Sequence, residues 1–339
     1  MNSFRKLMFG NIPDTIPVWF MRQAGRYLPG YMKARETMSI KDICINPEVA
    51  AEIMKEPVTK VGVDAAIVFF DILLPLESMG ISVDFQESVG PLLSGQREAD
   101  GKLKLNTFDR KMMKYPLNKV IEKFSEHNPE TPVIGFAGGP VTLLSYVVAN
   151  GADRELAMTK KYALRHEASF KENMAKLTEM VIDLLKLQIS AGSVAVQIFD
   201  SWAGFYSPYQ FTNLIKPYLQ EIASEITGLT KTIYFTTSGG GLAGPASECG
   251  FDFLSVDWRT RLSGIERETG GSVGLQGNLD PAIAASNLES ALRESRMILN
   301  DISGKEDYIF NLGHGVLPTT DFKTLRYIVE EVHSFRRRS

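Results

Sequence analysis

The chain has 339 residues, of which 44% are hydrophobic and 23% charged, and its formal net charge is -3. These proportions are typical of a globular protein with a sizeable core, and so small a net charge gives no general attraction to nucleic acid or to an anionic membrane. The two cysteines cannot build a disulfide framework, which fits a cytoplasmic protein. They and the four histidines are scattered, so no zinc pattern is expected. The apolar stretches are too short for a signal peptide or a membrane span, so we expect neither.

An apolar run begins near Pro17 and leads into a loop that carries two arginines, Arg22 and Arg26, with Gly25 between them. Arginine is always charged, and its planar fork matches the geometry of a carboxylate. Glycine lets a backbone approach a ligand closely. We interpret the loop as an anion-binding device, although pairing of both arginines with the protein's own acids is the alternative.

Seven further short apolar runs follow, mostly separated by helical patterns. They lie at 65–70, 133–136, 194–199, 232–235, 253–256, 273–275 and 308–310. This alternation predicts an α/β fold, a single (β/α)8 barrel of the TIM type over residues 1–339, with the active-site cleft at the C-terminal ends of the strands. A doubly wound open sheet is the structural alternative.

Several connections also have recognisable signals. Asn46 followed by proline predicts a helix start, as does Ser207 followed by proline. Residues 83–105 alternate and contain turn residues, which predicts an inserted hairpin. Apolar positions recurring every three or four residues predict a long helical region over 153–191.

Polar residues and glycines follow nearly every predicted strand. They are Arg22 and Arg26, Asp71, Gly138–Pro140, Asp200–Trp202, Thr236–Gly239, Asp257–Trp258, Gln276–Asn278 and Asn311–Gly315. The ends of barrel strands share one face, so these groups should line one polar pocket with arginines on one side and carboxylates within it.

Each candidate also has a structural interpretation. Asp71 is equally well placed to cap a helix, and Ser201 to cap or form a turn. Tyr146 lies on an apolar helix, where core packing is the commoner role. His314 stands between two glycines that offer little local packing, which favours a ligand contact. Asp200 and Asp257 are candidates for pairing with arginines.

Residues 239–244 fit the pattern G-x-G-x-x-G after a strand, which is the outline of a dinucleotide site. However, Pro245 follows at once, and few residues remain for a helix before the next strand. The pattern also comes after four strands rather than at the first, so we do not favour a nicotinamide site.

Long motifs resemble the uroporphyrinogen decarboxylase family in the family's order and over nearly the whole chain. They are Pro17–Pro29, Asp64–Ile67 leading into Asp71–Leu73, Gly135–Pro140 with Thr142, Gln197–Gly204, Val256–Trp258, Leu275–Pro281 and Phe310–Pro318. The resemblance implies a (β/α)8 barrel and a homodimeric carboxy-lyase of haem biosynthesis that needs no cofactor. Such an enzyme converts the four acetate side chains of uroporphyrinogen III to methyls, giving coproporphyrinogen III and CO2.

The resemblance also assigns roles to individual positions. It implies that the arginine loop binds the acidic side chains of the tetrapyrrole and that Asp71 meets the pyrrole N–H groups at the cleft centre. Asp71 and Arg22 are therefore the catalytic candidates. The implied substrate contacts are Arg22, Gln23, Ala24, Gly25, Arg26, Asp71, Tyr146, Ser201 and His314. The donor of the proton to the pyrrole stays open between Arg22 and a water molecule that Arg22 relays.

The chain departs from the family pattern at four places. Gly30 stands where an acidic residue is common, Phe70 replaces a frequent serine, and Val141 stands where tryptophan is usual. Residues 149–153 replace a more glycine-rich run. These positions flank the matched residues, so we expect them to affect the shape of the pocket wall.

Two other functions compete with this interpretation. A related barrel enzyme that transfers methyl groups to corrinoid or thiol acceptors generally needs a His/Cys zinc set, and Cys249 has no cysteine partner nearby. A non-catalytic porphyrinogen-binding paralogue is free to lose Asp71, which is present here. Both comparisons favour the decarboxylase.

Overall fold

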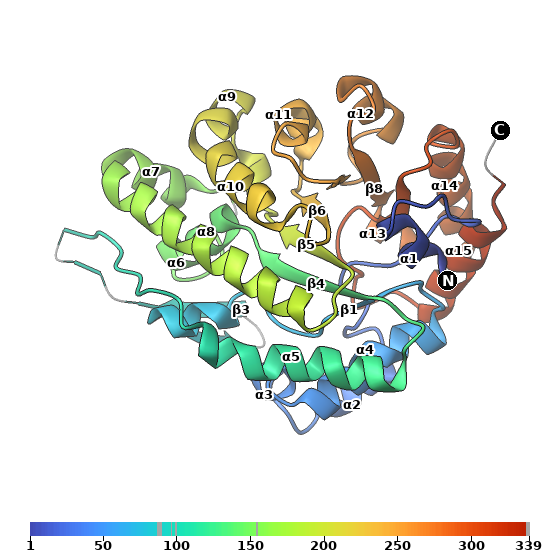
Figure 1. Cartoon of the computed structure of the whole chain (residues 1–339), viewed down its shortest axis with the longest axis horizontal. Coiled ribbons are helices and arrows are strands. Elements are labelled where there is room, and N and C mark those ends of the chain that lie inside the picture. The colour runs from blue at the N-terminus through green and yellow to red at the C-terminus, as the bar shows by residue number, and fades with distance from the viewer. Residues whose placement is uncertain (87–89, 96, 99, 154, 337–339) are drawn as a thin grey trace.

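The computed structural model describes residues 1–86, 90–95, 97–98, 100–153 and 155–336. A curled, parallel sheet of seven strands forms its centre, and a separate antiparallel hairpin lies beside it (Figure 1). The strands of the sheet are β1 (Ala66–Ile67), β4 (Val133–Gly138), β5 (Ala195–Phe199), β6 (Lys231–Phe235), β7 (Phe253–Ser255), β8 (Gly274–Leu279) and β9 (Tyr308–Leu312). The hairpin, predicted from the sequence, consists of β2 (Ser82–Gln86) and β3 (Gly90–Ser94).

Helices connect the strands and cover the sheet. In the first half of the chain they are α1 (Ser3–Met8), α2 (Pro29–Arg35), α3 (Ile40–Cys44), α4 (Pro47–Lys60), α5 (Arg110–His127), α6 (Pro140–Ala149) and α7 (Ala157–Arg165). The later ones are α8 (Glu167–Ser190), α9 (Pro208–Gln210), α10 (Lys216–Ile226), α11 (Ala243–Ser247), α12 (Leu262–Glu268), α13 (Pro281–Ala284), α14 (Leu288–Asp301) and α15 (Phe322–Ser334). In the described residues, no helix combines the length and the apolar character needed to cross a membrane.

The order of the strands in the sheet is the order of the chain, from β1 through β4 to β9. A doubly wound sheet has a point at which that order reverses, and this sheet has none, so the doubly wound alternative is wrong. All pairings are parallel, which brings the carboxyl ends of the strands to one face of the sheet. The loops that carry the predicted site residues therefore leave the same face.

The first predicted strand is the exception, because residues 18–21 form a single bridge between Val18 and Phe310 of β9. Side chains take the backbone N–H groups that a strand would use: Val18 donates to Asp64 Oδ2, Phe20 to Gln23 Oε1 and Met21 to Asn311 Oδ1. The segment still lies between β9 and residue 64, since Asp64 N–H donates to the Val18 carbonyl. The structure thus shows seven of the eight expected strands, and the closed barrel is only partly confirmed.

The predicted helix starts are confirmed. Asn46 accepts the Val49 N–H and caps α4, and Ser207 forms a reciprocal cap with Gln210 at α9. The long helical region begins later than predicted and is broken at His166, which separates α7 from α8. Asp153 explains the late start, because its carboxylate accepts the N–H and hydroxyl of Thr159 and fixes a turn before α7.

Candidate active site

Arg22 and Arg26 lie exposed in the loop after Met21. Within the described residues, neither guanidinium is paired with an acidic side chain, so the alternative that they serve the protein's own acids is not supported. Arg22 has a φ of 60°, a left-handed conformation that costs a residue other than glycine on the order of 1–3 kcal/mol. Both groups therefore remain free for an anion outside the fold.

The last loop of the sheet holds the strained arginine in place. Val316 N–H donates to the Met21 carbonyl at 2.8 Å, and Met21 N–H donates to Asn311 Oδ1 at 3.0 Å. A Cβ atom at Gly315 would lie 2.4 Å from Arg22 Cδ, so the arginine side chain crosses directly over that glycine. This contact brings Arg22 beside His314.

The three residues between Arg22 and Arg26 contact the protein's own fold. Gln23 is 1% exposed, and its amide accepts the Phe20 N–H and donates to the Ala65 carbonyl, so its side chain braces the loop from inside. A Cβ atom at Gly25 would lie 2.9 Å from the Arg22 carbonyl oxygen. The close approach that glycine permits is therefore made within the loop itself. Ala24 is half-buried and packs against the core.

Asp71 is half-buried in the loop that follows β1. One carboxylate oxygen accepts the Leu73 N–H at 2.7 Å, so the capping interpretation accounts for part of its role. Burial raises the pKa of Asp71 to about 6, against the lowering effect of the Leu73 and Leu74 N–H groups and of Arg22. The carboxyl group is thus poised to titrate just below neutral pH, which is typical of catalytic acids and bases.

His314 is neutral at neutral pH. Burial, followed by the charge of Arg22, lowers its pKa to about 4. Gly315 N–H donates to Nδ1 at 2.7 Å, which leaves the ring proton on Nε2. The ring packs edge-on against Phe235 of β6, so its orientation is fixed from two sides.

Tyr146 lies on α6 and stacks on Trp202 of the loop after β5, with the ring centroids 4.5 Å apart. Burial raises the pKa of Tyr146, and the charges of Arg22 and Asp71 act on it in opposite directions. Ser201 is half-buried at the start of the same loop, and its carbonyl accepts the N–H and hydroxyl of Thr237. No pattern in the sequence marked the ring stack, because it joins a helix to a loop that lies far away in the sequence.

Arg22 connects these groups electrostatically. Its charge lowers the pKa of Asp71, of Tyr146 and of His314, and such an effect requires that all of them lie near the guanidinium. The structure therefore brings four residues predicted from separate parts of the sequence into one charged cluster. Among the residues that the structure describes, neither Arg26 nor the Ser201 hydroxyl belongs to this cluster.

The remaining strand-end acids have structural roles. Asp257 is buried and pairs with Arg259 at 2.5 Å, as one alternative expected, and Arg259 also stacks on Trp258. Asp200 is buried, and its carboxylate accepts the Thr142 N–H, so pairing with an arginine is not its role. In the described part of the chain, no three His, Cys, Asp or Glu side chains are grouped to hold a metal ion.

The glycine run at 239–244 does not have the geometry of a dinucleotide loop. It forms a 3₁₀ turn, η4 (Gly239–Leu242), and the helix that follows, α11, has only 5 residues. A Cβ atom at Gly240 would lie 2.2 Å from the Thr260 hydroxyl, so close packing of two loops accounts for that glycine.

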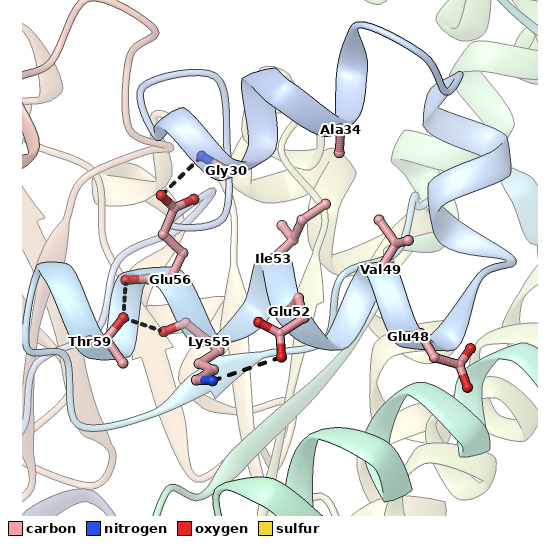
Figure 2. Close-up of a pocket in the computed structure, with 9 residues that line it drawn as sticks. All are labelled: Gly30, Ala34, Glu48, Val49, Glu52, Ile53, Lys55, Glu56 and Thr59. Carbon is pink, nitrogen blue, oxygen red and sulfur yellow. Dashed lines mark hydrogen bonds and ion pairs between the residues drawn. The ribbon is translucent and has the colours of Figure 1, made fainter.

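The departure at Gly30 also has a structural explanation. Figure 2 shows Glu56 of α4 pointing at the start of α2, where its carboxylate accepts the Gly30 N–H at 3.0 Å and the Tyr31 N–H at 3.3 Å. A Cβ atom at Gly30 would lie 2.6 Å from Glu56 Oε2, so no side chain fits there. An acid from a neighbouring helix thus occupies the place beside residue 30.

A cavity of about 460 Å³ opens between α2 and α4, lined by Ala34, Val49, Ile53 and neighbouring charged side chains (Figure 2). A second cavity, of about 550 Å³, lies near the amino ends of β6 to β9, on the face of the sheet opposite to the predicted site. None of the predicted site residues lines either cavity. The candidate site is therefore defined by the grouping of its side chains and not by either of these cavities.

Comparison with known proteins gives a consistent result over the whole chain. The family model for uroporphyrinogen decarboxylase (URO-D) matches residues 1–335. A uroporphyrinogen decarboxylase of Thermoplasma acidophilum is 45% identical over 98% of this chain and 99% of its own length. Those of Picrophilus torridus and Streptomyces coelicolor are 42% and 40% identical over 99% and 95% of this chain, and over 100% and 91% of their own lengths.

Solved structures show the fold alone. A methyltransferase from Methanosarcina mazei superposes with a TM-score of 0.82 at 19% identity, covering 97% of both chains. A B12-independent methionine synthase from a Shewanella species superposes with a TM-score of 0.57 at 10% identity, covering 87% of this chain and 91% of its own. Identity this low carries no statement about chemistry, whereas the sequence matches extend over the full set of motifs. The chain belongs to the uroporphyrinogen decarboxylase family.

Proposed function

We propose that this chain catalyses the decarboxylation of uroporphyrinogen III to coproporphyrinogen III, converting four acetate side chains to methyls. The observation that carries the proposal is the cluster of an unpaired arginine, Arg22, with the titratable Asp71, Tyr146 and His314. A substrate rich in carboxylates with inward-pointing N–H groups complements that cluster. Membership of the family supports the same activity.

The substrate supplies its own electron sink. Protonation of a pyrrole ring carbon gives a cation, and the electron pair of the breaking bond to the carboxylate flows into the ring as CO2 leaves. The exocyclic methylene that results takes a proton and becomes a methyl group, and the ring carbon loses its added proton. Because the ring accepts the electrons, we propose that the reaction needs no cofactor, and turnover should persist in the presence of a chelator.

The site residues then act by recognition and electrostatics. In its ionised form Asp71 accepts the pyrrole N–H bonds and stabilises the cationic ring, and such a preorganised partner contributes about 3 kcal/mol to lowering the barrier. Arg22 and Arg26 bind the peripheral carboxylates through bidentate hydrogen bonds. The neutral His314 donates from Nε2, while Tyr146 and Ser201 donate from their hydroxyls.

Assembly and location are proposed from the family resemblance. We expect a cytoplasmic homodimer that binds the tetrapyrrole and neither nucleic acid nor membrane. Sedimentation over a wide concentration range tests the dimer, and a monomer at every concentration would reject it.

Substitution of Asp71 tests the function most directly. Asp71→Asn keeps the size and one acceptor of the side chain but removes the charge, so kcat should fall roughly 100-fold or more. Asp71→Glu keeps the charge but extends it by one methylene toward the ring, so we expect an intermediate loss. The measurement is single-turnover decarboxylation under anaerobic, reducing conditions.

Circular dichroism of both variants controls for folding. Asp280→Asn is the matched control, because Asp280 also caps a turn after a strand but is not part of the cluster. Wild-type turnover in Asp71→Asn would show that Asp71 is only a cap, and the electrostatic mechanism would fail.

A further inference from the structure

Asp200 is a fully buried acid that the proposed chemistry does not use. It follows β5 directly, next to Ser201, and burial raises its pKa to about 6. Carboxylates are rarely buried without a charged partner, because removing the charge from water is costly. The position of Asp200 therefore needs a physical reason.

One carboxylate oxygen of Asp200 bonds to the amino end of α6. Its Oδ1 accepts the Thr142 N–H at 2.8 Å, and Thr142 occupies the first turn of that helix. Gly139, at the N-cap, has no side chain to offer, and a Cβ atom there would lie 2.2 Å from Asp200 Cβ. Asp200 thus supplies from another loop the anionic cap that a helix start favours.

Thr142 also bonds to the loop that carries Asp200. Its hydroxyl accepts the Trp202 N–H at 3.2 Å, so α6 and the loop after β5 are joined by hydrogen bonds in both directions. Thr142 is 2% exposed, which shields the bonds from water. One helical turn further along α6 lies Tyr146, whose ring stacks on the Trp202 ring. We call the hydrogen bonds of Thr142 with Asp200 and Trp202 the lock. The lock and the ring stack join the same two segments, α6 and the loop after β5.

We propose that Asp200 and Thr142 are positioning residues, which set Tyr146, Ser201 and Trp202 at their places near the carboxyl end of β5. The proposal rests on the proposed function, since Tyr146 and Ser201 matter only if the site binds a tetrapyrrole. Loss of the lock lets the first turn of α6 move relative to the loop after β5. A displacement of about 1 Å can cost as much as 100-fold in rate.

Thr142→Val tests the lock, because it removes the hydroxyl with little change in volume. We expect kcat/KM to fall at least tenfold, and Thr142→Ser, which keeps a hydroxyl, to recover most of the loss. The near-ultraviolet circular dichroism band that Trp202→Phe removes should also weaken in Thr142→Val. If Thr142→Val does not fold, Thr142→Ala removes the same hydroxyl without overpacking.

Thr232→Val is the matched control. Thr232 is also a buried threonine, and its hydroxyl bonds to Asp252, but it lies at the amino ends of the strands, at the opposite end of the sheet. It should lower the melting temperature while leaving kcat/KM and the circular dichroism band unchanged.

Two results would overturn the proposal: wild-type kcat/KM in a folded Thr142→Val, or an equal loss of kcat/KM in Thr232→Val. Absence of turnover in the wild-type protein would instead reject the proposed function. The circular dichroism comparison would still test the lock in that case, with an unchanged band in Thr142→Val rejecting it.

Discussion

Arg22 is the residue on which most of the site depends. It has a left-handed backbone and crosses over Gly315. Its charge opposes the rise that burial causes in the pKa of Asp71 and Tyr146, and it adds to the fall that burial causes in the pKa of His314. Strain of this kind persists only where the surroundings fix it, and here bonds from Asn311 and Val316 to Met21 do so. The guanidinium is therefore preorganised before any substrate arrives.

Replacement of Arg22 by lysine should impair the enzyme although the charge is kept. Lysine is a point charge on a flexible stem and lacks the planar fork that binds a carboxylate through two bonds. We expect kcat/KM to fall roughly 100-fold, as for loss of one preorganised electrostatic partner. Steady-state kinetics measures this, with Arg293→Lys on exposed α14 as the control. Near-normal kinetics in Arg22→Lys would mean that a general positive charge is enough.

The pH dependence of kcat/KM should report the ionisation of Asp71. Its pKa is raised to about 6, so below that pH the carboxyl group gains a proton and can no longer stabilise a cationic ring. We expect kcat/KM to fall about tenfold per pH unit on the acid side. His314, with a pKa lowered to about 4, is neutral throughout this range and adds no second step.

Two variants assign that acid limb. Asp71→Asn should show a low activity without the limb, whereas Asp200→Asn should keep it, although the pKa of Asp200 is also raised to about 6. An acid limb that survives in Asp71→Asn would exclude Asp71 as its source.

The sequence could predict that Arg22, Asp71 and His314 share one face, because polar groups at strand ends must do so. Tyr146 lies on a helix, and only the family resemblance assigned it to the site. The sequence could not predict that Gln23 points inward, since an exposed glutamine and a buried one look alike in a loop. It also could not predict that the small size of Gly25 makes room for the Arg22 carbonyl, because that close approach lies within the fold of the loop. Contacts between segments that are distant in the sequence, such as the stack of Tyr146 on Trp202, leave no local pattern.

At the scale of elements, hydrophobic runs predicted every strand of the central sheet. The segment 18–21 failed to become a strand although it is fully apolar, because side chains of Asp64, Gln23 and Asn311 take its N–H groups. An apolar run predicts burial, and only the position of hydrogen-bond partners decides whether a ladder forms. Those partners lie far away in the sequence or inside the next loop.

Helix α2 directly follows the arginine loop, so its anchor at Glu56 should affect substrate binding. Glu56→Ala removes the carboxylate that accepts two N–H groups at the start of α2 and pairs with Lys60. We expect a loss of about 1–3 kcal/mol in the free energy of unfolding and a raised KM. Urea denaturation and steady-state kinetics measure the two effects.

Glu52→Ala provides the control for that prediction. Glu52 lies one turn earlier on α4, is exposed, and pairs with Lys55 at 3.8 Å, so little change is expected. An unchanged KM in Glu56→Ala would show that the position of the arginine loop does not depend on α2.

At the scale of the whole molecule, the two ends of the chain meet at the site. Residues 17–22 contact β9 and the loop that follows it, so the arginine loop and His314 are neighbours although they lie far apart in the sequence. The methyltransferase likeness at a TM-score of 0.82 shows that this fold alone does not specify the reaction. The residues at the strand ends carry that information, which is why their motifs identified the family.

The buried acids should also shape the stability of the whole protein. Asp200 has a pKa of about 6 in the folded chain and 3.8 as its reference, so the folded state binds its proton more tightly. That stabilisation is present below about pH 4 and is lost as the pH rises through 6. Asp71 acts in the same direction, while His314, with a lowered pKa, acts in the opposite one.

Comparing the wild type with Asp200→Asn isolates the contribution of one acid, because the other groups cancel. Asparagine keeps an acceptor for the Thr142 N–H but carries no charge to bury at any pH. Two units of pKa correspond to about 3 kcal/mol, so the stability of Asp200→Asn relative to wild type should improve by about that amount between pH 4 and pH 7. Urea denaturation at unit steps of pH measures the difference, and most of the change should fall between pH 4 and pH 6. A difference that is constant with pH would mean that Asp200 is ionised in the folded protein as readily as in the unfolded chain.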